Sequence, residues 1–204
     1  MQKIDYKKEL KHLYSASAKK VVIVEVPAMN FLMIDGAGDP NTSQTFQKAV
    51  ETLFGVSYTL KFMIKKGKGG FDYGVMPLEG LWWTEDMSRF SIDAKDDWQW
   101  ILMIMQPKLV TRELVGEAIA QVRKKKNTES LTTLRFEAFA EGKAAQIMHV
   151  GPFSTEGPTI QKVHNHIRSA GGTLSGKHHG IYLSDIRKAA PSFWSSMCRK
   201  TIPD

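Results

Sequence analysis

The chain has 204 residues, 42% of them hydrophobic, and a formal net charge of +7 at pH 7. These values are typical of a folded globular protein with a real core, built as one large domain or as two smaller halves. The charged N-terminus and the shortness of the longest apolar run, residues 100–105, argue against an export signal or a membrane span. The single cysteine, Cys198, excludes an internal disulfide and a cysteine-based zinc cluster. We therefore expect a cytoplasmic protein.

Two basic runs raise the question of nucleic-acid binding, because clustered lysine and arginine side chains bind phosphate groups. They cover residues 64–70 and 122–127, at the ends of helix-like segments, where lysines favourably meet the negative end of the helix dipole. Neither run contains interleaved aromatic residues. We interpret both as solvated helix ends and expect no direct nucleic-acid binding.

Short β-branched and aromatic runs, bounded by glycine or proline, predict several strands. Residues 21–27 and 29–36 are expected to pair with each other across a turn at Pro27. Residues 134–152 are expected to form a hairpin that turns at residues 141–143. The further strands are expected over residues 71–83, 98–107, 178–185 and 193–203.

Apolar side chains recur at helical spacing in two long segments, residues 44–64 and 111–126, which predicts amphipathic helices. Thr42 or Ser43 is the expected N-cap of the first. A third helix is expected over residues 156–172, because its last residues are glycines that suit a C-terminal cap.

A repeat links the two halves of the chain. In residues 31–50 and again in residues 146–164, a strand runs into Gly36 or Gly151, a polar loop follows, and a helix begins with Thr-Phe-Gln-Lys or Thr-Ile-Gln-Lys. We interpret this pattern as a duplication. The expected fold is α+β, with two strand-strand-helix-strand-strand halves related by a pseudo-twofold axis, antiparallel sheets, helices on one side and a ligand groove between the halves. The halves cover about residues 20–107 and 133–204, and a helical connection covers residues 108–132.

Four segments of the chain resemble, in order and spacing, the stand-alone GyrI-like proteins, which are relatives of the effector-binding domains of multidrug-sensing transcription regulators. The segments are DYKKELKHLYSASAKKVVIVEVPAMNFLMIDGAGDPN, PLEGLWW, HVGPFSTEGPTIQKVH and HHGIYLSD. The resemblance implies a duplicated α/β fold and a central hydrophobic groove for bulky, often planar and cationic molecules. Some members of the family hydrolyse cyclopropane-bearing genotoxins, so the resemblance also implies this reaction as an alternative activity. The family pattern in the last segment is His-His-Glu-x-Tyr, whereas this chain has Gly180 at the position of the ligand-facing glutamate.

The candidate ligand-binding residues are aromatic side chains and residues of the expected strand that contains Gly180. Strand alternation places Gly180 on the same face as Tyr182, where a glycine forms either a pocket floor or a β-bulge. Alternation also sends the two adjacent tryptophans to opposite faces, so that one lines the groove and the other fills the core. His149 and Phe153 flank a strand end, where either ligand contacts or hairpin packing would explain them. The full candidate set is Tyr73, Trp82, Trp83, His149, Phe153, Gly180 and Tyr182.

No metal site or cofactor is expected. His178 and His179 are adjacent on a strand, so their side chains point oppositely and do not chelate one metal ion. Three acidic residues remain as substitutes for the carboxylate that is absent at position 180, although each is as easily a structural hydrogen-bond acceptor: Glu79, Glu137 and Asp185.

The leading functional hypothesis is a cytoplasmic binding protein for hydrophobic, planar or cationic small molecules, with no membrane partner and an open oligomeric state. The first alternative is a hydrolase of cyclopropane-bearing genotoxins, which Gly180 weakens because hydrolysis needs a base. The second is an effector-sensing role in transcription regulation, which requires a separate DNA-binding partner.

Overall fold

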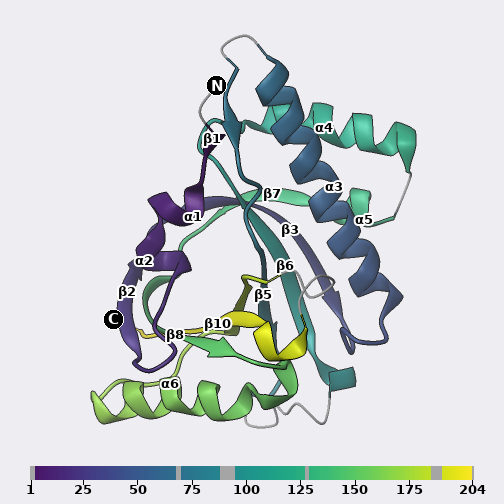
Figure 1. Cartoon of the computed structure of the whole chain (residues 1–204). Coiled ribbons are helices and arrows are strands. Elements are labelled where there is room, and N and C mark those ends of the chain that lie inside the picture. Colours follow the sequence, from purple (N-terminus) through teal and green to yellow (C-terminus); the bar gives the residue numbers. More distant parts are fainter. Residues whose placement is uncertain (1–2, 68–69, 88–94, 127–128, 185–189, 204) are drawn as a thin grey trace.

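A computed structural model describes residues 3–67, 70–87, 95–126, 129–184 and 190–203 (Figure 1). Its main element is one curled sheet in which every neighbouring pair of strands is antiparallel, as the duplication predicts. A short parallel pair lies apart from it. In sheet order the strands are β2 (Val22–Val26), β8 (Gly142–Val150), β10 (Ser195–Thr201), β9 (His178–Tyr182), β5 (Leu78–Trp83), β6 (Gln99–Gln106), β3 (Met29–Ala37) and β7 (Arg135–Phe139), and the parallel pair is β1 (Lys3–Ile4) with β4 (Asp72–Tyr73).

The predicted helices are confirmed, and their caps explain where they begin. Ser43 accepts a hydrogen bond from the backbone N–H of Phe46, and Thr111 accepts one from Leu114, so both helices have a side-chain N-cap. Gly171, with φ +79°, follows the end of the third helix. The helices are α1 (Tyr6–Glu9), α2 (Lys11–Tyr14), α3 (Gln44–Lys66), α4 (Arg112–Lys125), α5 (Ser130–Thr133) and α6 (Gly157–Ser169), with single 3₁₀ turns at η2 (Lys95–Asp97), η3 (Phe153–Thr155) and η4 (Pro191–Phe193).

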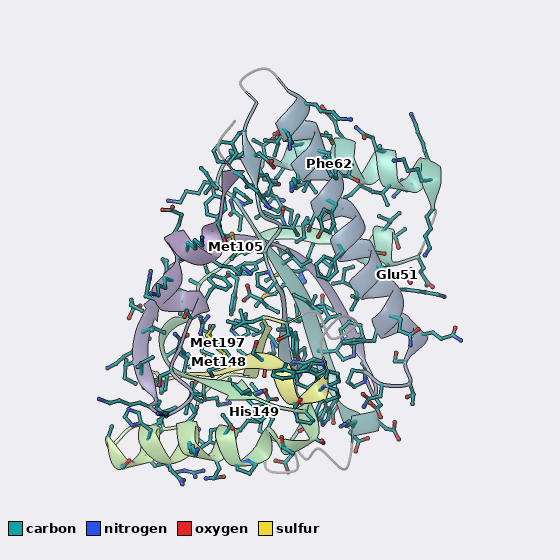
Figure 2. The ribbon with its side chains drawn as sticks, viewed as in Figure 1. Glu51, Phe62, Met105, Met148, His149 and Met197 are labelled. Carbon is teal, nitrogen blue, oxygen red and sulfur yellow. The ribbon has the colours of Figure 1, made fainter. Side chains whose placement is uncertain are left out.

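Helices α3 and α6 cover the same face of the sheet, which we call the helix face (Figure 1). Gln106 of β6 donates to Ser57 of α3, and His149 of β8 contacts Thr159 of α6. Figure 2 places His149 beside α6. The opposite face is covered by residues 5–16, the N-terminal segment, so we call it the N-terminal face. Its core includes Leu13, which is fully buried.

Two expected strand pairings are wrong. Residues 21–27 and 29–36 do not pair with each other, because β2 pairs with β8 and β3 pairs with β6 and β7. Residues 134–152 do not form a hairpin, because β7 pairs with β3 while β8 pairs with β2 and β10. Apolar alternation fixes which face a side chain occupies but not which strand lies alongside.

The exchanged strands explain why the sheet curls. Short connectors, residues 27–28 and 140–141, join strands that lie near opposite ends of the sheet order. A connector of two residues spans only about 10 Å, so the two ends of the sheet must approach each other. The order is symmetric about the pairing of β9 with β5, and each four-stranded half takes its outer strand from the other half of the chain.

Among the described residues, no helix combines the length and apolarity that crossing a bilayer requires.

Candidate functional site

Two glycines face each other at the centre of the sheet. Gly80 of β5 pairs directly with Gly180 of β9, where the two halves meet. A Cβ atom built on Gly80 would lie 2.6 Å from Nε1 of Trp82, and one on Gly180 would lie 3.1 Å from the hydroxyl oxygen of Tyr182. The glycines therefore leave space that the indole and phenol rings fill. Gly180 pairs in register with Cys198 on its other side, which excludes the β-bulge considered from the sequence.

Aromatic rings gather above this glycine pair on the helix face. Phe46 packs against Trp82 with ring centroids 5.9 Å apart, and Phe153 packs edge-on against Tyr182 at 5.4 Å. The two groups of rings meet over Gly180, where a built Cβ atom would lie 3.6 Å from Trp82 Nε1 and 3.1 Å from the Tyr182 hydroxyl oxygen. The aromatic cluster comprises Phe46, Trp82, Trp98, Trp100, Phe153, Tyr182 and Trp194.

Most of the cluster is shielded from solvent. Trp82 is 4% exposed and Trp100 is fully buried, whereas Phe153, Tyr182 and Trp194 remain partly exposed. Burial raises the pKa of Tyr182, so its hydroxyl stays protonated throughout the neutral range. The cluster is thus a largely apolar surface whose polar groups are the Tyr182 hydroxyl and the indole N–H groups of its tryptophans.

Four of the seven sequence candidates come together here: Trp82, Phe153, Gly180 and Tyr182. Of the two adjacent tryptophans, Trp82 faces the helices and Trp83 points to the N-terminal face. The Lys177 ammonium lies over the Trp83 ring, 4.1 Å from the ring centroid. The other two candidates take separate places. His149 holds the turn before α6 through contacts of 3.0 Å to Thr159 and 3.1 Å to the carbonyl of Pro152.

Tyr73 lies away from the cluster. It belongs to β4, packs edge-on against Tyr6 at 6.3 Å and is 1% exposed. The expected strand over residues 71–83 is broken between Gly74 and Pro77, so alternation does not carry from Tyr73 into β5.

A carboxylate that the sequence reasoning missed lies beside the glycine pair. Oε1 of Glu156, the residue before α6, accepts hydrogen bonds from Ser196 Oγ at 2.6 Å and from Cys198 Sγ at 3.3 Å. Ser196 and Cys198 are the β10 partners of Tyr182 and Gly180. The segment HVGPFSTEGPTIQKVH contains Glu156, but no local pattern indicates that α6 docks its first turn on β10.

The Glu156 charge affects the pKa values of the neighbouring titratable groups. Burial raises the pKa of the Cys198 thiol and Glu156 raises it further, so this cysteine is a poor nucleophile. Burial lowers the pKa of His178 to about 4, although Glu156 acts in the opposite direction. His178 is therefore neutral at physiological pH.

Residues 19–194 match the model of the GyrI-like small molecule binding domain. The chain belongs to the GyrI-like family. Three solved structures are similar to this GyrI-like protein. An uncharacterized conserved protein from Listeria innocua is 40% identical, with a TM-score of 0.90 over 98% of this chain and 100% of that one. A hydrolase from Listeria innocua is also 40% identical, with a TM-score of 0.88 over 99% of this chain and 100% of that one.

The third structure is the C-terminal domain of EcmrR, which is 11% identical, with a TM-score of 0.56 over 91% of this chain and 98% of that one; this likeness concerns the fold alone. No curated protein matches the chain.

The N-terminal face of this GyrI-like protein carries a buried charged network directly behind the glycine pair. His179 Nε2 lies 3.0 Å from Glu79 Oε2, and its Nδ1 lies 2.9 Å from Glu141 Oε2. Arg199 donates to the same Glu141 oxygen at 3.2 Å. Tyr14 of the N-terminal segment donates to Glu79 Oε1 at 2.7 Å. The network fixes the N-terminal segment to the sheet.

Electrostatics within the network favour the charged forms. Burial acts to raise the pKa of Glu141, but the charges and hydrogen bonds of His179 and Arg199 outweigh it and lower that pKa to about 2. Burial acts to lower the pKa of His179, but Glu141 and Glu79 outweigh it and raise that pKa to about 9. At neutral pH the network thus contains a buried imidazolium between two carboxylates.

The network also accounts for one of the expected substitute carboxylates. Glu79 binds Tyr14 and His179 on the N-terminal face, away from the aromatic cluster. Glu137 lies on β7, where it is exposed and pairs with Arg135 at 3.2 Å. Asp185 lies outside the described residues. In the described part of the chain, no three His, Cys, Asp or Glu side chains are arranged to hold a metal ion.

Proposed function

We propose that this GyrI-like protein binds bulky hydrophobic or planar small molecules, including cationic ones, at the aromatic cluster of the helix face. The observation that carries the proposal is the Gly80–Gly180 pair beneath Trp82 and Tyr182. Backbone without side chains permits a flat ligand to approach the sheet closely. Indole and phenol rings then stack on planar molecules, and their negative faces attract cations.

Ligand entry requires movement of the rings, because Trp82 is 4% exposed in the closed arrangement. Apolar ligand surface that leaves water on binding contributes about 25 cal/mol per Å² to the affinity. The flat faces of the rings stack on planar ligands of different outline, which permits broad specificity.

The proposal is tested by titrating the protein with the planar cation 10-methylacridinium and recording tryptophan fluorescence. We expect saturable quenching, because Trp82 and Trp98 lie within the proposed site, with ring centroids 5.4 Å apart. The variant Gly180→Val fills the floor and should weaken binding. The control Gly116→Val lies on α4, where a Cβ atom meets nothing within 4 Å, and should bind as the wild type does. Absence of quenching at high dye concentration would refute the proposal.

Hydrolysis is the second candidate, favoured by the 40% identity to a protein described as a hydrolase. Hydrolytic opening of a cyclopropane adds water across a strained C–C bond, with the hydroxyl going to one carbon and the proton to the electron-accepting side. This step needs a base near the substrate. Position 180 provides none in this chain, and the neighbouring Glu156 carboxylate is already held by Ser196 and Cys198 through Oε1. We therefore propose slow or no turnover. Gly180→Glu should raise the rate of a cyclopropane-bearing substrate, followed by mass spectrometry of the ring-opened product; fast turnover by the unmodified chain would contradict this.

A further inference from the structure

We infer that Glu156 is the specificity-determining residue of the helix-face site and that its carboxylate selects ligands that carry a positive charge or an N–H donor. The inference rests on the binding proposed above and identifies the side chain that makes the affinity for one ligand higher than that for another. It assigns this role to the residue that precedes α6 rather than to the strands of the sheet.

The hydrogen bonds of Glu156 hold the carboxylate over the strand next to the glycine pair. Its two donors, Ser196 and Cys198, face Tyr182 and Gly180 across the β10–β9 pairing. Neighbouring strands lie about 4.8 Å apart. A ring system seated on the glycine pair therefore lies within contact distance of the carboxylate.

Both of these hydrogen bonds reach the same oxygen, Oε1. No lysine or arginine of the described segments forms an ion pair with Glu156. Lys200, which is the β10 partner of His178, donates a hydrogen bond to the carbonyl oxygen of Gly176 at 2.7 Å instead. His178 is held neutral by burial, with a pKa of about 4. The site thus presents one negative charge that no described side chain neutralises.

A partly buried carboxylate that has no cationic partner among the described residues gains more from a cationic ligand than a solvated carboxylate does, because less water competes for it. The same carboxylate repels anions and gains nothing from uncharged aromatic molecules that lack an N–H donor. A ligand preference for cations therefore follows from the position of Glu156 beside the rings, whereas the rings themselves supply the affinity shared by neutral and charged ligands.

A purely structural role for Glu156 would be to fasten α6 to β10 through Ser196. Two substitutions separate the roles. Glu156→Gln removes the charge and retains an oxygen that accepts from Ser196. Ser196→Ala removes the 2.6 Å hydrogen bond and retains the charge. Glu137→Gln is the matched control, because it makes the same change at an exposed residue of β7.

The experiment compares 10-methylacridinium with acridine in mildly alkaline buffer, where acridine is uncharged and the two ligands share a flat ring system. Dissociation constants come from calorimetry, and thermal melting checks that each variant is folded. We expect Glu156→Gln to weaken binding of 10-methylacridinium roughly tenfold, the scale of one partly desolvated charge–charge contact, because this cation has no N–H donor. Binding of acridine should change by no more than about twofold. Ser196→Ala and Glu137→Gln should leave the ratio of the two dissociation constants unchanged.

The outcomes separate this inference from the proposed function. Equal loss of both ligands in Glu156→Gln, an unchanged cation affinity, or the same loss of cation preference in Ser196→Ala would overturn the role of Glu156 while leaving binding at the cluster intact. Failure of both ligands to bind the wild type would overturn both.

Discussion

His178 and His179 are neighbours in the chain but should shape the pH dependence of stability in opposite directions. His178 is on the helix face and 7% exposed, and burial lowers its pKa to about 4. His179 is on the N-terminal face between Glu79 and Glu141, and these carboxylates raise its pKa to about 9 against the effect of burial. Both start from an ordinary value of 6.5 in the unfolded chain.

The sign of each contribution follows from comparing folded and unfolded values. A raised pKa means that the folded state holds its proton more tightly, so the contribution of His179 is complete below pH 6.5 and is lost as the pH rises toward 9. A lowered pKa means the reverse, so the contribution of His178 is complete above pH 6.5 and is lost as the pH falls toward 4. Each shift corresponds to about 3 kcal/mol, as one pKa unit is worth about 1.4 kcal/mol.

The free energy of unfolding should therefore be greatest near pH 6.5 and fall by about 3 kcal/mol on each side. Glu141, with its pKa of about 2, adds a further loss between pH 4.5 and pH 2. Urea unfolding at a series of pH values measures the curve, and the imidazole Cε1–H signals in nuclear magnetic resonance report the two pKa values directly. A flat curve between pH 6.5 and 9, or a His179 signal that titrates near 6.5, would refute the reasoning.

Two further substitutions test the packing and the charged network. Gly36→Ala should destabilise the chain by about 1–3 kcal/mol, the usual cost of overpacking, because its Cβ would lie 2.1 Å from the Trp100 ring; urea unfolding measures this, and Gly116→Ala, which meets nothing within 4 Å, should show no such loss. Tyr14→Phe should cost about 1–3 kcal/mol, because it leaves one oxygen of the buried Glu79 without its donor; a thermal midpoint equal to that of the wild type would contradict the clamping of the N-terminal segment.

The sequence predicts the elements well because their signals are local. Ser43 and Thr111 cap helices whose apolar spacing is complete within one segment. Alternation also places Gly180 and Tyr182 correctly on one face, since strand geometry requires it. The repeat of the Gly36 and Gly151 segments likewise predicts two equivalent strand-helix units, and α3 and α6 follow them.

What the sequence does not predict depends on contacts between distant segments. Pairing partners are set by the whole sheet, so residues 21–27 were expected beside 29–36 although β2 lies beside β8. Choosing between Trp82 and Trp83 requires knowing on which side α3 packs. Glu156 reaches Ser196 and Cys198, the strand next to the glycine pair, only because α6 packs against β10, and no spacing in the sequence indicates this packing.

The swapped outer strands make the two repeats mutually dependent. A fragment that ends before residue 108 lacks β7 and leaves the edge of β3 bare, and a fragment that begins at residue 133 lacks β2 and leaves the edge of β8 bare. Bare edges invite pairing with other chains. Because one chain carries both halves, each half receives its outer strand from the same molecule, and the pairing does not depend on protein concentration.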